Sequence, residues 1–500
     1  MRNITKRFGP VLANDKVWLD IYRGEILALL GENGSGKTTL MNMLSGIYFP
    51  DEGEIAIDGK NVVIRSPKDA FDLGIGMIHQ HFKLVDVLTA AENIVLGLEE
   101  KLDLKLAAEK IRTICSAYGF EVDPEQKIYN MSVSQKQTVE IVKVLYRGAD
   151  ILILDEPTAV LTPQETDKLF EVLRNMRNDG KAIVIITHKM HEVEELSDRV
   201  AILRHGQFVG DMLTRETNAQ EMTNMMVGHA VTLNIDRPEP VDPKPRIVVE
   251  GLTVRSIDGI LKLEDVSFTA NSGEILGIAG ISGCGQKELL ESIAGLQPVE
   301  SGSICYIDDD GKREELIGED PLSIQELGVS LSFVPEDRLG MGLVGNMDLS
   351  DNMMLRSFRR GRSFFTDRKS PRALAEHVVN DLEVSTPSVS TPVRRLSGGN
   401  VQKVLVGREI ASAPTVLLTA YAVRGLDINS SYTIYDLINR QKAAGVAVIY
   451  VGEDLDVLLE LADRILVLCG GKVSGIVPGR GALKRDVGMM MTKLGGNAHE

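Results

Sequence analysis

The sequence predicts an α/β fold in which two tandem domains each contain a largely parallel β-sheet. Three observations support this expectation: apolar runs that alternate with helical patterns, a glycine-rich loop in a strand–loop–helix context, and an internal repeat. The apolar runs at 26–30, 151–154 and 182–186 have the length of buried strands, and segments of helical spacing separate them. Such alternation is typical of parallel sheets that are covered by helices.

The internal repeat fixes the number of domains at two. The tripeptide Gly24-Glu25-Ile26 recurs at 273–275, and the pair Asp198-Arg199 recurs at 463–464. Between the two copies, residues 237–245 are rich in proline, which predicts an extended linker. We therefore expect one domain at 1–236 and a second at 246–500, joined by this linker.

Composition excludes several classes of protein. A chain of 500 residues is too long for one hydrophobic core, and a net charge of −16 argues against a nucleic-acid-binding surface. The four cysteines lack C-x-x-C spacing, which favours a reducing compartment over a disulfide framework or a zinc site. No apolar run approaches the ~18 residues of a membrane span, and the first residues lack the apolar core of a signal peptide. We expect a soluble, cytoplasmic chain.

Residues 31–38, with the sequence Gly-Glu-Asn-Gly-Ser-Gly-Lys-Thr, have the form G-x-x-x-x-G-K-[ST] of a phosphate-binding P-loop. The glycines allow backbone N–H groups to close on phosphate oxygens, and the N-terminus of the following helix favours their negative charge. We expect Lys37 to contact the β- and γ-phosphates and Thr38 to bind Mg²⁺. The residues expected to bind the nucleotide here are Gly31, Glu32, Asn33, Gly34, Ser35, Gly36, Lys37, Thr38 and Thr39.

Two acidic residues follow the apolar run at 151–154 directly, as Asp155 and Glu156. Buried parallel strands place such carboxylates at the edge of the sheet where ligands bind. We expect Asp155 to orient Mg²⁺ and Glu156 to polarise an attacking water as a general base. The alternative is a strand end that is capped by two solvated acids, and the P-loop upstream argues against it.

The order of these motifs resembles that of the ABC ATPases, over both halves and nearly the whole chain. The resemblance rests on the P-loop, Gln80, a serine-containing stretch near 132, the sequence at 155–158, and His188. It implies that each domain adds an antiparallel β subdomain and a helical subdomain to the parallel sheet, and that ATP and Mg²⁺ are the cofactors. It further implies that Phe8 stacks on adenine, that Gln80 senses the metal and faces the membrane subunits, and that His188 contacts the γ-phosphate.

The two halves differ in the groups that hydrolysis requires. Aligned on the repeat, Gln286 takes the place of Lys37, Ala420 of Asp155, Tyr421 of Glu156, Glu336 of Gln80, and Glu453 of His188. A neutral amide cannot supply the charge that a lysine offers to phosphate. Neither alanine nor tyrosine can hold a metal or act as a carboxylate base. The second nucleotide pocket is therefore expected to be degenerate.

The signature stretches show the opposite asymmetry. Residues 396–403, Leu-Ser-Gly-Gly-Asn-Val-Gln-Lys, closely resemble the family's L-S-G-G-Q stretch, whose glycines let a helix N-terminus approach a γ-phosphate. The first half has Val133 and Ser134 in place of these glycines. Because ABC domains pair head to tail, the resemblance implies one competent composite site and one degenerate site. The competent site would be completed by Ser397, Gly398, Gly399 and Asn400.

A tandem chain with this pattern looks like the ATP-binding subunits of bacterial importers for simple sugars and nucleosides. Residues 77–82, residues 146–150 and the loss of both acids at 420–421 favour the nucleoside branch. The resemblance implies two membrane permease subunits and an extracytoplasmic solute-binding protein as partners, no nucleic acid, and a place at the cytoplasmic face of the membrane through the permeases only. Three alternatives stay open: a monosaccharide importer ATPase, a translation-associated tandem ABC protein, and a regulatory nucleotide-binding module.

Overall fold

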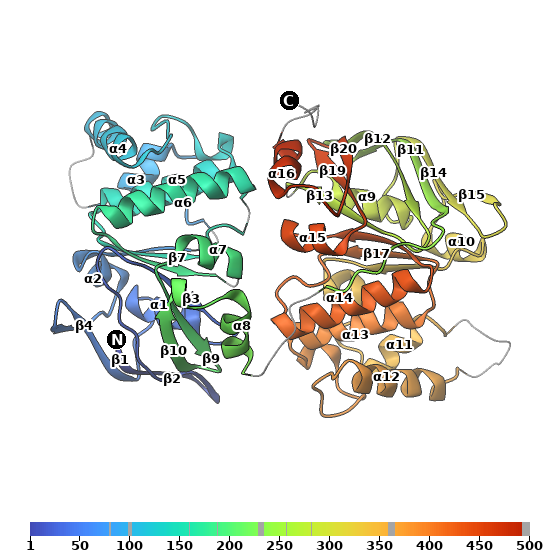
Figure 1. Cartoon of the computed structure of the whole chain (residues 1–500), viewed down its shortest axis with the longest axis horizontal. Coiled ribbons are helices and arrows are strands. Elements are labelled where there is room, and N and C mark those ends of the chain that lie inside the picture. The colour runs from blue at the N-terminus through green and yellow to red at the C-terminus, as the bar shows by residue number, and fades with distance from the viewer. Residues whose placement is uncertain are drawn as a thin grey trace. The chain divides into compact units, whose positions relative to one another are not determined.

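The chain divides into two compact units, Met1–Leu233 and Asn234–Glu500, in a computed structural model (Figure 1). The structure describes residues 1–79, 82–98, 103–159, 161–187, 189–228, 235–256, 258–281, 283–358 and 366–492. Within these ranges, no helix is both long enough and apolar enough to cross a membrane.

A six-stranded sheet forms the centre of the first unit, with the strand order β10-β9-β3-β8-β7-β6. All neighbouring pairs are parallel except β9 with β10, which confirms the predicted parallel core. Every residue of β3 and β8 is buried, as expected for strands that are covered on both faces. The strands are β3 (Ile26–Leu30), β6 (Ile75–Ile78), β7 (Ile151–Asp155), β8 (Ala182–Ile186), β9 (Arg199–Arg204) and β10 (Gln207–Leu213).

An antiparallel sheet and a group of helices complete the first unit, which confirms the expected subdomains. The second sheet has the order β2-β1-β4-β5, formed by β1 (Arg2–Phe8), β2 (Val11–Val17), β4 (Glu52–Ile57) and β5 (Lys60–Val62). In Figure 1, α3, α4 and α5 lie at one end of this unit and β1, β2 and β4 at the other. The helices are α1 (Lys37–Leu44), α2 (Pro67–Asp72), α3 (Ala90–Val95), α4 (Leu104–Tyr118), α5 (Val133–Tyr146), α6 (Pro163–Asn178), α7 (Met190–Leu196) and α8 (Ala219–Val227), with 3₁₀ turns at Ile128–Asn130 and Thr214–Glu216.

The second unit repeats this architecture. Its six-stranded sheet has the order β16-β17-β18-β13-β19-β20, and its four-stranded sheet the order β12-β11-β14-β15. The strands are β11 (Pro245–Arg255), β12 (Leu261–Asn271), β13 (Ile275–Gly280), β14 (Ser301–Ile307), β15 (Arg313–Glu315), β16 (Leu331–Val334), β17 (Val416–Ala420), β18 (Ala447–Val451), β19 (Arg464–Cys469) and β20 (Lys472–Pro478). The helices are α9 (Gln286–Ile293), α10 (Pro321–Glu326), α11 (Leu349–Met354), α12 (Lys369–Asp381), α13 (Gly398–Ala411), α14 (Ile428–Ala443), α15 (Leu455–Leu461) and α16 (Lys484–Thr492), with short turns at Arg338–Gly342 and Val393–Arg395.

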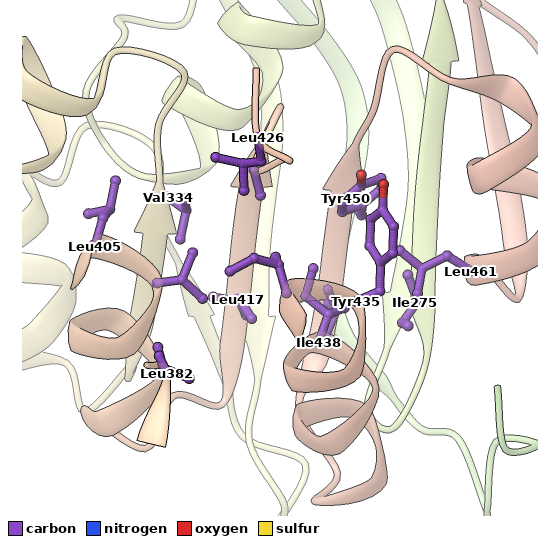
Figure 2. Packing of buried hydrophobic residues seen from close by; sticks show 14 of the residues in the cluster. Ile275, Val334, Leu382, Leu405, Leu417, Leu426, Tyr435, Ile438, Tyr450 and Leu461 are labelled. Carbon is purple, nitrogen blue, oxygen red and sulfur yellow. The ribbon is translucent and has the colours of Figure 1, made fainter. Parts of the chain in front are cut away.

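The largest buried cluster of the second unit joins its six-stranded sheet to the helices that cover it (Figure 2). Leu417 of β17 and Tyr450 of β18 are each 1% exposed, and they belong to one cluster with Tyr435 and Ile438 of α14. Burying one such side chain stabilises the fold by about 1.5–3 kcal/mol. Figure 2 shows Tyr435 and Tyr450 within this cluster, so the two tyrosines take part in the packing of α14 against the sheet.

The segment 237–245, which we expected to be a linker, begins with two residues that contact the second unit. Arg237 is 7% exposed, and its guanidinium donates to the carbonyl oxygens of Leu459, at 3.3 Å, and Ala462. The ammonium of Lys442 donates to the carbonyl oxygen of Pro238 and to Asp463, at 2.7 Å. Proline content predicts an extended backbone but carries no information on distant partners for Arg237. Residues 237 and 238 belong to the compact unit Asn234–Glu500, and the domain limits expected at 236 and 246 stay a prediction.

Candidate functional site

The P-loop lies between the end of β3 and the start of α1. Its glycines serve two different purposes. Gly36 has φ +94°, and a Cβ there would lie 2.3 Å from the carbonyl oxygen of Ala13, so only glycine fits against β2. Gly34 has φ +83° and faces open space. The loop is therefore fixed on one side by the protein and left open on the other, as a phosphate cradle requires.

Lys37, the first residue of α1, is folded back onto this loop. Its side chain is 7% exposed, and Nζ donates to the carbonyl oxygens of Gly31 at 2.6 Å and Glu32 at 3.0 Å. Burial lowers the pKa of Lys37, and the nearby carboxylates of Glu156 and Asp155 act in the opposite direction. The ammonium is thus held at the loop by carbonyl oxygens, and the carboxylates of Asp155, at the end of β7, and of Glu156, directly after it, lie close to it.

Thr38 and Asp155 come together, as the sequence predicts for a magnesium site. The hydroxyl of Thr38 donates to Oδ2 of Asp155 at 3.2 Å, across 117 residues of sequence. Burial raises the pKa of Asp155, and the hydrogen bond from Thr38 opposes this. One hydroxyl and one carboxylate oxygen are the ligand types that Mg²⁺ prefers, so these side chains fit the metal that the P-loop implies.

Glu156 adopts a left-handed backbone conformation directly after β7. Its φ is +48°, and its N–H donates to the carbonyl oxygen of Ile186 at the end of β8, at 2.9 Å. Tyr421, its counterpart in the second unit, has φ +52° and donates in the same way to Val451 at 2.9 Å. A left-handed residue other than glycine costs on the order of 1 kcal/mol. The turn is therefore common to both units, and only the side chain that it presents differs.

The second unit keeps the shape of the P-loop without its cation. Gly285 has φ +96°, close to the value of Gly36. Gln286 is 3% exposed and donates from Nε2 to the carbonyl oxygen of Ile281 at 3.2 Å, just as Lys37 donates to Glu32. The amide of Gln286 therefore supplies a hydrogen bond to the loop carbonyl but brings no charge to it.

An ion cluster that the sequence did not lead us to expect surrounds Tyr421. The guanidinium of Arg424 pairs with Glu336 and, at 2.9 Å, with Glu453, and it lies 5.9 Å from the centre of the Tyr421 ring. Burial, together with the two glutamates, raises the pKa of Tyr421 to about 12. The phenol therefore stays protonated at neutral pH and cannot act as a base. The sequence feature that could have indicated this cluster is Arg424, which takes the place of Ala159 in the repeat.

Each signature stretch begins a helix within its own unit. Ser132 caps α5 in a reciprocal pair with Gln135, whose side chain accepts from the N–H of Ser132 at 2.9 Å. Ser397 caps α13, and the Asn400 amide donates to its hydroxyl at 2.8 Å. Only the second helix has glycines in its first turn, at positions 398 and 399. Two positions of this turn thus lack side chains, and the guanidinium of Arg338 donates to the carbonyl oxygen of Gly398 at 3.4 Å. The role of Ser397 to Asn400 against a γ-phosphate stays a prediction.

The remaining predicted residues are less closely defined. Phe8 ends β1 and is 42% exposed, with its ring packed edge-on against Tyr48 at 5.1 Å between centroids. Its role against adenine stays a prediction. Gln80 and His188 lie outside the described residues.

Two largely parallel sheets, each with a P-loop turn after a central strand, define a tandem P-loop protein. The chain belongs to the ABC transporter family, whose model matches residues 14–159 and 263–419, together more than half of the chain. The fold, the family and the ATPase class inferred from the motifs are thereby confirmed.

Several curated relatives are similar over nearly their whole length. The nucleoside import ATP-binding protein NupA of Lactococcus lactis subsp. cremoris is 40% identical, over 100% of this chain and 98% of its own. The guanosine import ATP-binding protein NupO of Bacillus subtilis is also 40% identical, over 98% and 96%. A ribose import ATP-binding protein, RbsA 1 of Rubrobacter xylanophilus, is 37% identical over 97% and 96%.

A solved structure shares the tandem fold. The archaeal ribosome recycling factor aABCE1, in complex with ribosomal stalk protein aP1, superposes with a TM-score of 0.65 at 16% identity, over 98% of this chain and 92% of that chain. At this identity, the likeness concerns the fold alone.

Proposed function

We propose that this chain is the ATP-binding subunit of an importer for nucleosides, and that it hydrolyses ATP at the first unit only. The observation that carries the proposal is the convergence of Lys37, Thr38, Asp155 and Glu156 at the ends of β3 and β7, while the second unit has Gln286, Ala420 and Tyr421 at the corresponding places.

The chemistry expected of the first unit follows from its side chains. Lys37 and the backbone N–H groups of the loop bind the phosphates, and Lys37 stabilises the charge that develops on them during transfer. Thr38 and Asp155 are the residues that would hold Mg²⁺, and the metal would neutralise negative charge on the phosphates. Glu156 accepts a proton from the attacking water. The positive φ places this carboxylate immediately beyond the buried strand end.

The second unit supports nucleotide binding without hydrolysis. Its loop retains the glycine conformations of a phosphate cradle, but Gln286 contributes no charge and Tyr421 stays protonated. Arg424 forms ion pairs with Glu336 and Glu453, so its positive charge is already neutralised by protein carboxylates.

The solute class and the partners are inferred from relatives. Two relatives that are named for nucleoside or guanosine import are 40% identical over nearly the full length, which favours nucleosides, and a ribose import relative at 37% makes monosaccharides the second candidate. Such a subunit works with two membrane permeases and an extracytoplasmic solute-binding protein. It would lie at the cytoplasmic face of the membrane through the permeases, with the surface around Gln80 and Glu336 against them.

The test is reconstitution of the chain with the permeases and binding protein of its own operon in proteoliposomes. We expect uptake of radiolabelled guanosine or adenosine that depends on internal ATP, and no uptake of ribose. The matched control is Glu156→Gln, which should lower ATP hydrolysis and uptake together by about 10²–10⁴-fold while ATP still binds. Uptake of ribose instead would assign the second candidate, and hydrolysis by the variant at the parent rate would refute the role of Glu156.

A further inference from the structure

The first unit contains a buried carboxylate, that of Glu192, close to the turn that follows β7. Glu192, in the first turn of α7, is 6% exposed. The hydroxyl of Thr158 donates to this carboxylate, with contacts of 2.6 and 2.7 Å to its two oxygens. The ammonium of Lys189 pairs with it at 3.0 Å, and the hydroxyl of Thr187 lies 3.4 Å from it. A buried carboxylate is costly unless it is hydrogen-bonded and paired, and this one is both.

These contacts join the two segments that hold Glu156. Thr158 follows Glu156 by two residues, and Thr187 follows Ile186, whose carbonyl oxygen accepts from the N–H of Glu156 at 2.9 Å. A second contact restrains the same turn, because buried Gln137 of α5 donates to the carbonyl oxygen of Pro157 at 2.6 Å. Glu156 lies between Pro157 and the end of β7, so contacts from both α5 and α7 restrain the turn that holds it.

The second unit provides a natural comparison, because it has the same turn without the network. The counterparts of Thr158, Thr187, Lys189 and Glu192 are Val423, Gly452, Asp454 and Val457. A Cβ at Gly452 would lie 2.7 Å from Cε1 of buried Tyr450, so the place of Thr187 has no room for a side chain there.

The left-handed turn still forms at Tyr421, with φ +52°. The network is therefore not needed to build the turn. Its presence coincides instead with the unit that carries the base and the metal carboxylate.

We propose that Glu192 is a positioning residue for ATP hydrolysis, and that through Thr158 it fixes the carboxylate of Glu156 relative to the end of β8. This inference rests on the proposed function of the first unit. A general base is effective only within hydrogen-bond reach of its water, and a displacement of about 1 Å can lower a rate by about 10²-fold. The binding of ATP, which depends on the P-loop, does not require this alignment.

Three variants test the proposal in the assembled transporter. Thr158→Val removes one hydroxyl without changing the volume and copies Val423 of the second unit. Glu192→Ala removes the carboxylate, whereas Glu192→Gln keeps an oxygen that can accept from Thr158. We expect Thr158→Val and Glu192→Ala to lower kcat by about 10- to 100-fold with KM for ATP within about twofold of the parent. Glu192→Gln should retain more activity than Glu192→Ala, and Thr158→Val combined with Glu192→Ala should be no worse than the poorer single variant, because both act through one contact.

The control is Thr223→Val, which removes another buried threonine hydroxyl of the first unit, one that donates within α8 to Ala219 at 2.7 Å. It should leave kcat unchanged. Parental kcat in Thr158→Val would overturn the proposal, as would a loss of ATP binding in parallel with kcat. Should Glu192→Ala not fold, Thr158→Val alone decides the question. If Glu156→Gln also hydrolyses ATP at the parent rate, then the proposed function fails, whatever the result at Glu192.

Discussion

Replacing Lys37 with glutamine should weaken ATP binding without disturbing the loop that holds the residue. The second unit already contains this substitution as Gln286, whose amide donates to a loop carbonyl at 3.2 Å, where Lys37 donates at 3.0 Å. Lys37→Gln therefore keeps one loop carbonyl as a partner for the buried position, and it removes the charge together with the second hydrogen bond, to Gly31. Hydrogen bonds to a charged group contribute about 1.5–3 kcal/mol, and each 1.4 kcal/mol is a factor of ten in affinity. The affinity for ATP should fall about 10- to 150-fold.

The assay is titration of the purified chain with a fluorescent ATP analogue, beside a thermal unfolding curve. We expect weaker binding together with an unfolding midpoint that stays near that of the parent in the absence of nucleotide. The reciprocal variant, Gln286→Lys, restores the charge in the second unit, where Ala420 and Tyr421 still lack the carboxylates, so it should not raise the rate of hydrolysis. Unchanged affinity in Lys37→Gln would refute the assignment of Lys37 to the phosphates.

Two further predictions concern charged groups at the two turns. Burial raises the pKa of Asp155, so its contribution to folding stability is fully present below the unfolded pKa and is lost as the pH rises through the folded pKa. Asp155→Asn should therefore raise the thermal unfolding midpoint of the nucleotide-free protein at neutral pH, with a gain that disappears in acid, and should abolish hydrolysis; a midpoint below that of the parent at neutral pH would contradict this. Arg424→Ala breaks a partly exposed cluster with Glu336 and Glu453, so a chemical denaturation curve should show a loss of at most about 1 kcal/mol, and the ATPase rate should stay unchanged. A large fall in that rate would show that the second unit takes part in hydrolysis.

Local sequence patterns were enough to predict the fold and to bring Thr38 and Asp155 together. The P-loop, the strand that precedes it and the acids after β7 are each continuous in sequence, and strand alternation implies that parallel strand ends meet at one edge. The contact between Thr38 and Asp155, at 3.2 Å, therefore follows from topology alone. The repeat likewise predicted two units.

Other features depend on pairs of side chains that sequence patterns do not connect. Arg237, in the predicted linker, donates to carbonyl oxygens more than two hundred residues away in the second unit. Arg424 joins two glutamates from separate loops, and Glu192 meets Thr158 across 34 residues. Arginine, glutamate and threonine are all common in exposed loops. Residue type alone therefore did not distinguish these paired side chains from solvated ones.

The central claim is that hydrolysis takes place at the first unit alone, and vanadate trapping of a photoreactive ATP analogue tests it most directly. The assembled transporter would carry a protease site inserted at the 233/234 boundary, and the labelled, denatured chain would be cut there. Trapping requires turnover, so we predict label on the fragment 1–233 only, and none in the Glu156→Gln variant. Equal vanadate-dependent labelling of both fragments would contradict the account.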